Sequence, residues 1–155
     1  MKYLFLLWGI LMFSLPSYAE QNVLKLSWWG KISVSFPYNT NKVSGLSLGM
    51  GSNTTTLNGL QADILFSKAE QVRGVQAAFL GKANQLAGIQ ANFVNVSHRY
   101  AAGMQVGFIN RANEITGLQI GVVNKATILK GLQLGIINIA ENGWFPAMVL
   151  VNGRF

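Results

Sequence analysis

Three consecutive copies of one repeat read GMQVGFINRANEIT (103–116), GLQIGVVNKATILK (117–130) and GLQLGIINIA (131–140). Glycines that open such copies are spaced 14, 15, 14, 15, 14 and 14 residues apart along the chain: Gly45, Gly59, Gly74, Gly88, Gly103, Gly117 and Gly131. Self-similarity at a fixed short period is the signature of repeat architectures. The chain therefore carries seven copies over residues 43–142, the first of them degenerate.

Within a copy, apolar and polar residues alternate with a period of two. If the opening glycine is position 0, positions 1, 3 and 5 are apolar, while positions 2 and 4 are Gln and a small or short polar residue. This alternation predicts a strand of about six residues in each copy. We expect its aliphatic face to lie inside the protein and its Gln/Gly face to lie on the surface.

Further apolar and small residues predict corners in the chain. An apolar residue precedes the opening glycine by two positions, as at Ile115 and Leu129, and would also point inward if the chain turned at the glycine. Glycine suits such a corner, and Asn is the next most tolerant of positive φ. We expect a second corner at the asparagines Asn95, Asn110, Asn124 and Asn138, followed by small interior residues at Ala112, Ala126 and Ala140. Each copy is then predicted to form one coil of a narrow, all-β, parallel β-solenoid.

An antiparallel meander or up-and-down β-barrel is the alternative fold, and a small outer-membrane barrel, as a narrow pore or a structural barrel, is the alternative function. Loops of three and four residues between hairpin strands would also keep each Gln opposite the next one. A transmembrane barrel needs strands of about ten residues, whereas the apolar stretch of each copy covers about half of that length. In either fold the Gln side chains line up, and in a stack they would form an amide ladder.

The two ends of the chain depart from the repeat. Residues 20–42 contain an alternating segment from Leu24 to Phe36, which predicts an amphipathic strand that runs into a turn at 37–41. Residues 143–155 contain the stop signal GWFP (143–146) and a last strand over Met148–Val151. Atypical ends are expected of a stack, because the terminal coils must cover an exposed core.

The first nineteen residues predict a secretory signal peptide. Lys2 supplies a positive start, 3–13 is apolar, and small residues precede Ala19. These are the features of a cleaved signal, and we expect cleavage after Ala19. The mature protein is therefore predicted to be exported, to the cell surface or the outer membrane.

The composition of the chain excludes several classes of protein. Its 155 residues are 50% hydrophobic and 11% charged, and they include no cysteine, which rules out disulfides and Cys-based zinc sites. The formal net charge is +7, but the cations are scattered singly along the sequence. Nucleic-acid binding needs a basic cluster or a recognition motif, so we expect no nucleic-acid partner.

Few side chains offer chemistry, and we expect no catalytic residue, cofactor or metal site. His98 is the one histidine and is interpreted as a solvated turn residue. Asp63 occupies the small position on the Gln/Gly face, where we expect it to pair with Gln61, Gln76 or a cation. An enzyme needs converging acid, base or metal groups, so the chain is predicted not to be an enzyme.

The surface that the sequence favours for binding is the Gln/Gly face. We expect it to carry the apolar residues of position 6 as well, and exposed apolar rows mark interaction surfaces. Its partner would be an envelope or surface component or a second copy, with association at the outer membrane as another outcome. The predicted interaction residues are Gln61, Gln76, Gln90, Gln105, Gln119, Gln133, Val94, Ile109, Val123 and Ile137.

The tandem pattern GLQxGxxNxA, closed by GWFP (143–146) and VNGRF (151–155), resembles the bacterial surface-repeat proteins of spirochaetes and other Gram-negative bacteria. The resemblance covers about residues 43–155 and implies an exported protein at the envelope or cell surface, with no established reaction or ligand. The spacing QxGxxNxA over 105–112, 119–126 and 133–140 is also similar to the curlin repeats of bacterial amyloid fibres. Bulky pairs such as Val122-Val123 and a shorter period depart from that second pattern.

Overall fold

The computed structural model describes residues 22–36 and 41–155, and these form an all-β protein. One open sheet contains six strands in the order β2-β1-β3-β4-β5-β6. The predicted signal peptide, residues 1–19, lies outside the described residues. The strands are β1 (Asn22–Trp29), β2 (Ile32–Phe36), β3 (Lys42–Val106), β4 (Ile109–Ile120), β5 (Val123–Ala140) and β6 (Ala147–Arg154).

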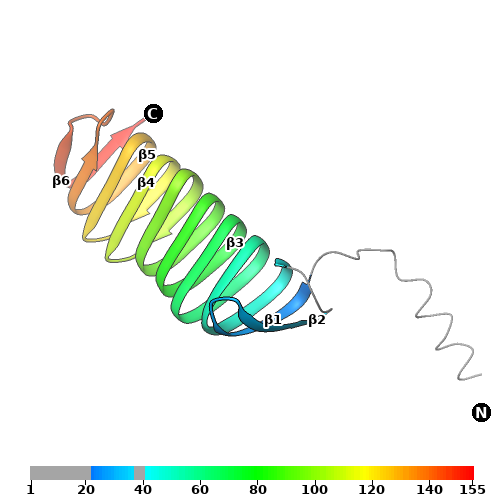
Figure 1. The fold of residues 1–155 in the computed structure, drawn as a ribbon. Coiled ribbons are helices and arrows are strands. Elements are labelled where there is room, and N and C mark those ends of the chain that lie inside the picture. The colour runs from blue at the N-terminus through cyan, green and yellow to red at the C-terminus, as the bar shows by residue number, and fades with distance from the viewer. Residues whose placement is uncertain (1–21, 37–40) are drawn as a thin grey trace, which may run out of the picture.

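Successive repeats pair in parallel, each copy lying directly on the next. Gly103 pairs with Gly117 and Gln105 with Gln119 between β3 and β4, and the same register continues from β4 to β5. The long strand β3 winds through the earlier coils of the stack (Figure 1). The repeats therefore pair in parallel, as the favoured interpretation of the sequence predicted. They do not pair antiparallel, as the strands of a meander would.

The opening glycines have the positive φ values that the sequence predicted. From Gly45 to Gly131 these φ angles lie between 124° and 152°. At Gly117 an added Cβ would collide with the backbone carbonyl oxygen of Gly103 in the preceding coil. Any side chain at this row would therefore separate two coils, in addition to the strain of the positive φ itself.

The interior of the stack is narrow and mixes aliphatic and amide side chains. The apolar residues two positions before each glycine are fully buried, as expected, and so are the alanines that follow the asparagines. They form one core cluster with members in every coil: Val43, Leu57, Ala69, Val72, Ala83, Leu86, Ala101, Ala112, Ile115, Ala126, Leu129 and Ala140.

The prediction of which strand face lies inside was wrong. Gln119 is 0% exposed, whereas Ile89 is 39% and Phe93 is 46% exposed. The alternation of inward and outward side chains runs unbroken through the glycine, so that Ile115 and Gln119 share the interior. The chain turns at each glycine without exchanging its two faces, and positions 1, 3 and 5 consequently remain outside.

The asparagine corners were also predicted wrongly. Leu150 is the one described non-glycine residue with positive φ, so the asparagine backbones are not left-handed. Instead Asn95, Asn110, Asn124 and Asn138 are 0% exposed and point into the stack. The direction of the chain changes just before them, where consecutive residues at positions 5 and 6, such as Val122 and Val123, both face outward.

The N-terminal segment is a hairpin and not the single strand that the alternation predicted. Strand β1 pairs antiparallel with β2 around Gly30, whose φ is 54°, and pairs parallel with the start of β3. The polar side of β1 faces inward, since Lys25 is 1% and Ser27 is 5% exposed. The predicted turn at 37–41 falls largely on residues 37–40, which lie outside the described residues.

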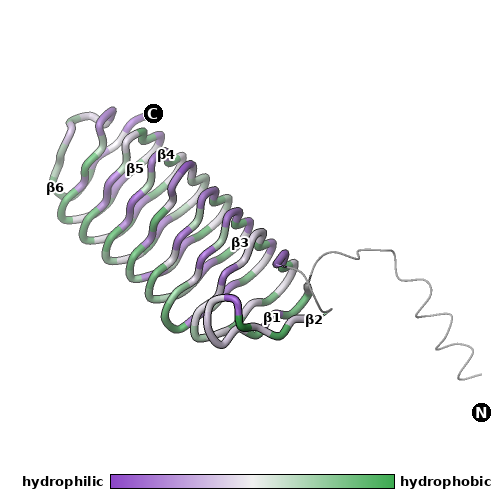
Figure 2. Tube along the Cα trace, in the orientation of Figure 1, coloured by the Kyte–Doolittle hydropathy of each residue, from purple (hydrophilic) through white to green (hydrophobic). Residues whose placement is uncertain are grey.

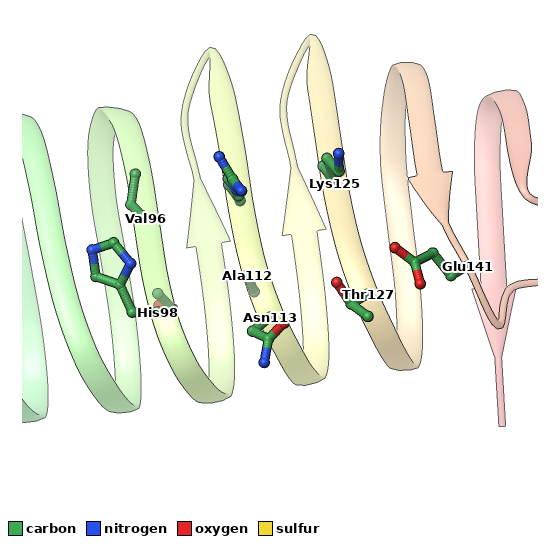
Figure 3. A pocket seen from close by; sticks show the side chains of 9 residues that line it. Val96, His98, Ala112, Asn113, Lys125, Thr127 and Glu141 are labelled. Atoms are coloured by element: carbon green, nitrogen blue, oxygen red, sulfur yellow. The ribbon is translucent and has the colours of Figure 1, made fainter.

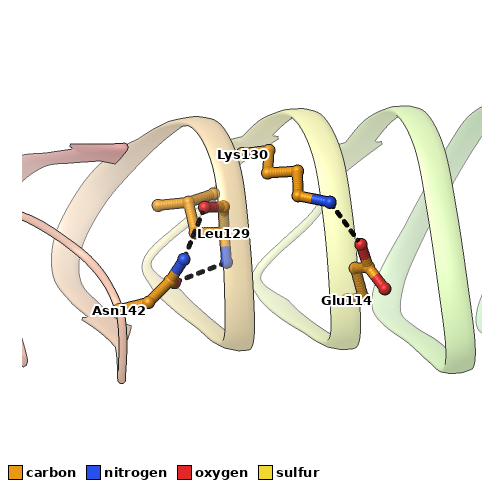
Figure 4. Close-up of polar contacts among 4 residues, drawn as sticks. All are labelled: Glu114, Leu129, Lys130 and Asn142. Atoms are coloured by element: carbon orange, nitrogen blue, oxygen red, sulfur yellow. Dashed lines mark hydrogen bonds and ion pairs between the residues drawn. The ribbon is translucent and has the colours of Figure 1, made fainter. Parts of the chain in front are cut away.

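The C-terminal segment closes the other end of the stack. Strand β6, which contains the predicted 148–151 strand, pairs antiparallel with β5. The side chain of Asn142 accepts a hydrogen bond from the backbone N–H of Leu129 (2.7 Å) and donates one to its carbonyl oxygen (3.0 Å), as a further strand would (Figure 4). Nearby, exposed Lys130 donates to Glu114 at 2.9 Å.

Candidate functional site

The six predicted glutamines form a continuous amide ladder in the interior. From Gln76 onward, each Nε2 donates to the Oε1 of the glutamine one coil earlier, at 2.7–2.8 Å from Gln90 to Gln133 and at 3.3 Å from Gln76 to Gln61. All six side chains are 0% exposed. Buried amides are tolerated when they are hydrogen-bonded, and here each coil supplies the partner of the next. The glutamines are therefore structural and not part of a surface.

A second amide ladder runs through the asparagines. Asn95, Asn110 and Asn124 each donate to the Oδ1 of the asparagine one coil later, at 2.7–2.8 Å. Each also donates to a backbone carbonyl at the adjacent corner, such as Ile120 for Asn110 at 2.8 Å. This second bond fixes the corner, which explains why Asn recurs there although its own φ is ordinary.

The other four predicted interaction residues do lie on the surface. Ile109 is 38% and Ile137 is 46% exposed, while Val94 and Val123 are partly exposed. They occupy position 6 and lie outside the coil, beside the outward aliphatic residues and away from the glutamines. The structure thus separates the predicted set into interior amides and exterior aliphatic residues.

An extended apolar face covers one side of the stack, and we define it as positions 1, 3, 5 and 6 of the copies that begin at Gly59. None of these side chains is buried, and together they follow the stack from coil to coil. Figure 2 shows hydrophobic segments recurring at the same place in successive coils. The members of the apolar face are Leu60, Ala62, Ile64, Leu65, Val75, Ala77, Phe79, Leu80, Ile89, Ala91, Phe93, Val94, Met104, Val106, Phe108, Ile109, Leu118, Ile120, Val122, Val123, Leu132, Leu134, Ile136 and Ile137.

A short stack of aromatic rings runs along the middle of this face. The rings of Phe79 and Phe93 are parallel with centroids 4.9 Å apart, and those of Phe93 and Phe108 follow at 5.0 Å. The three side chains remain 46–58% exposed. Stacking between coils is favourable, yet part of each ring in the stack remains in contact with solvent.

Strand β1 continues the apolar face at the N-terminal end. Its register places Leu24 beside Leu46 and Leu26 beside Leu48. An open hollow of about 340 Å³ lies here and is lined chiefly by apolar side chains, among them Leu26, Leu48 and the 71% exposed Trp28.

The opposite side of the stack is polar. A shallow hollow of about 320 Å³ lies there across several coils, and Figure 3 shows His98, Asn113, Thr127 and Glu141 around it. Arg111 and Lys125 also line this hollow, and each follows a position-6 residue of the apolar face by two residues. His98 is exposed and lies in β3, at the register shift between Ser97 and Tyr100, and not in a turn. No hydrogen bond or ion pair joins its ring to the other residues of this hollow.

Asp63 lies in a buried polar cluster near the N-terminal end. Its Oδ2 accepts hydrogen bonds from Ser52 and Ser67, each at 2.5 Å, and from Gln61 at 3.1 Å. The predicted pairing with Gln61 is confirmed. Burial raises the pKa of Asp63, and the three hydrogen bonds and the charge of Lys25 offset part of that increase. Burial likewise lowers the pKa of Lys25, which donates to the carbonyl oxygen of Asn53.

Two negative findings apply to the described residues alone. Within 22–36 and 41–155, no group of three or more His, Cys, Asp or Glu is placed to hold a metal ion. The same part of the chain contains no helix that could cross a membrane.

Sequence reasoning predicted the exposed apolar residues of position 6, but not those of positions 1, 3 and 5, which complete the apolar face. One signal could have found it: Ile115, Gly117 and Gln119 follow one unbroken alternation, which places Gln on the same side as a core aliphatic residue. Searches of protein-family models, curated proteins and solved structures find no match for this chain.

Proposed function

We propose that this protein is an exported, non-catalytic binding protein of the cell envelope, and that it acts through the apolar face of its coil stack. The observation that carries the proposal is the continuity of that face, which extends from Leu24 in β1 to Ile137 in β5. Large contiguous exposed apolar patches on proteins mark interaction or membrane sites.

The size of the face supports a binding role. The six copies that define the face, at the spacing of neighbouring strands, extend over about 29 Å. Isolated exposed aliphatic residues need no explanation, but an ordered row with four outward apolar positions in each of six successive copies does. The amide ladders hold this surface rigidly, because each coil is bonded to the next through side chains as well as backbone.

Export to the envelope is supported by the sequence. Residues 1–19 have the features of a cleaved signal peptide, and the repeat pattern resembles that of bacterial surface-repeat proteins. In a bacterial host, the mature protein is expected in the envelope fraction, and N-terminal sequencing is expected to begin at Glu20. Recovery of the uncleaved chain from the cytoplasm would contradict the export part of the proposal.

The role of the face is tested by a pair of double variants with the same change in charge. Ile64→Asp with Ile136→Asp places two carboxylates on the apolar face at side chains that are 69% and 59% exposed, so little packing is lost. Asn84→Asp with Asn113→Asp adds the same charge to exposed positions on the polar side.

We expect the unmodified protein and the polar-side variant to sediment with the envelope, and the apolar-face variant to appear in the soluble exported fraction. Circular dichroism and the urea midpoint of each purified variant confirm that the fold is kept. A folded apolar-face variant that still sediments with the envelope would overturn the proposal that this face is the binding surface.

A further inference from the structure

Cationic side chains lie at both long edges of the apolar face, in four of its six copies at one edge and in two at the other. One edge follows directly after the inward Asn row or its counterpart and carries Lys68, Lys82, Arg111 and Lys125. The other edge directly precedes the opening glycines and carries Arg73 and Lys130. Outward residues follow one another around a coil in chain order, so each of these six cations is the first charged group beside the apolar face in its own coil. In the coils without one of them, the first charged group lies further from the face, as at Arg99, Glu114 and Glu141. We call them the cationic rims.

Carboxylates are kept away from the face itself. Among the described residues, Asp63 is buried in the stack, while Glu70, Glu114 and Glu141 occupy the outward positions of the polar side. Glu114 reaches Lys130, but this exposed pair is of the kind that contributes little. Among the described residues, the apolar face itself therefore carries no carboxylate, and one of its six rim cations, Lys130, is paired with a carboxylate.

The neighbouring rim cations Arg111 and Lys125 favour a partner that is anionic. They are direct neighbours in the parallel register between β4 and β5, and both are exposed. Like charges on adjacent strands are unfavourable in isolation. An anionic partner that lies against the rim relieves this repulsion, whereas a neutral or cationic one does not.

The apolar face and its cationic rims together indicate which kind of partner can bind there. In a face-to-face pair of two copies, the rims of one copy would lie against the rims of the other, positive against positive. A lipid leaflet offers acyl chains to the apolar side chains and phosphate groups to the lysines and arginines at their edge. Trp28, exposed at the end of the face, is of the residue type that favours the membrane–water interface.

We propose that the apolar face and its cationic rims dock onto an anionic lipid surface, with the axis of the coil stack lying along the membrane. This inference rests on the proposed function, since it names the partner of the same face. The aliphatic side chains and the phenylalanine stack enter the acyl boundary, and the rim cations bind lipid phosphates. The protein lies on the leaflet in this arrangement and does not cross it.

The test uses the protein as it accumulates in the expressing bacterium, purified and mixed with vesicles. One set of vesicles contains equal amounts of phosphatidylglycerol and phosphatidylcholine, and the other contains phosphatidylcholine alone. We expect cosedimentation and a blue shift of tryptophan fluorescence with the anionic vesicles, and at least tenfold weaker binding to the neutral ones. High salt is expected to weaken the anionic binding, because it screens the rim charges.

Two matched arginine variants test whether binding depends on a cation at the rim or only on the net charge of the protein. Arg111→Gln removes a rim cation and is expected to weaken binding to anionic vesicles roughly fivefold, the effect of one cation near an anionic surface. Arg99→Gln removes an exposed arginine from the polar side and is expected to change binding less than about twofold, since it is not at the rim and screening weakens the interaction of more distant charges with headgroups.

Three outcomes would overturn the inference. They are equal binding to both vesicle types, equal loss from the two arginine variants, and absence of vesicle binding. Light scattering that shows a dimer, lost on Ile64→Asp with Ile136→Asp, would assign the face to a second copy instead. If the Ile64→Asp, Ile136→Asp variant leaves the envelope in cells but the purified unmodified protein does not bind anionic vesicles, the proposed function stands and the proposed lipid partner is wrong. If the face variant stays in the envelope, the proposed function itself fails.

Discussion

Gln119 donates a hydrogen bond from its Nε2 to the Oε1 of Gln105 at 2.8 Å, fourteen residues earlier in the chain and one coil away in space. It also accepts one from Gln133 at 2.7 Å. The amide therefore uses both of its ends to join three consecutive coils. This contact is the repeating unit of the structure, because side chains and backbones hold the same parallel register.

Replacement of one glutamine of the amide ladder should destabilise the stack of coils. Gln119→Ala removes an amide that is 0% exposed and leaves Gln105 Oε1 and Gln133 Nε2 each without this partner. Unsatisfied buried polar groups cost about 1–3 kcal/mol each, and we expect a loss of about 2–5 kcal/mol in the free energy of unfolding. Urea denaturation measures it. The exposed Gln85→Ala is the control, with an expected change within about 0.5 kcal/mol. Equal midpoints for the two variants would refute a structural role of the ladder.

The glycine row should tolerate no side chain. At Gly117 the φ of 138° and the nearby carbonyl of Gly103 both oppose a Cβ. Gly117→Ala should therefore cost several kcal/mol or prevent folding altogether, since a backbone atom cannot move without separating the coils. Gly30→Asn is the matched control. The φ of Gly30 is 54°, a region that Asn adopts readily, and the nearest atom to an added Cβ is at 3.7 Å. Expression and thermal unfolding of both variants provide the comparison.

Asp63 should make the stability of the protein depend on pH. Its pKa is raised above the ordinary value of 3.8, so the folded state favours the protonated carboxyl. The associated stability is present below that value and is lost as the pH rises through the raised pKa of the folded state. Urea midpoints between about pH 4 and pH 7 should therefore fall more steeply for the unmodified protein than for Asp63→Asn. Parallel curves for the two proteins would contradict this assignment.

Spin labels can report the direction of the strands. Val106 pairs with Ile120 in parallel register, and Met104 pairs with Leu118, so 106 and 120 are one strand spacing apart while 104 and 120 are offset by two residues. A double label at 106 and 120 should give the shorter distance and stronger dipolar broadening than one at 104 and 120. All three positions face outward, which favours retention of the fold. The reverse order of the two distances would mean an antiparallel arrangement.

The amino-acid sequence was sufficient to predict the repeat, its strand character, the backbone role of the glycines and the existence of an amide ladder. It also identified interior residues such as Leu129 and Ala126. These features follow from the spacing of residue types, and each copy repeats them with little variation. The aliphatic residue two positions before glycine was a reliable sign of the interior, because its burial does not depend on where the glutamines point.

Which side of each strand faces the interior depends on how the coils pack on one another, and this could not be predicted from one copy of the repeat. Hydropathy within a single copy favours burying residues such as Ile120 over Gln119, and that expectation was wrong. A buried glutamine is costly in one isolated coil, but a stack supplies a donor and an acceptor from the coils above and below. The coil interior is also narrow, so Gln, Asn, Ala and one aliphatic residue per copy fill it. The remaining aliphatic residues are left on the surface, where they form the apolar face.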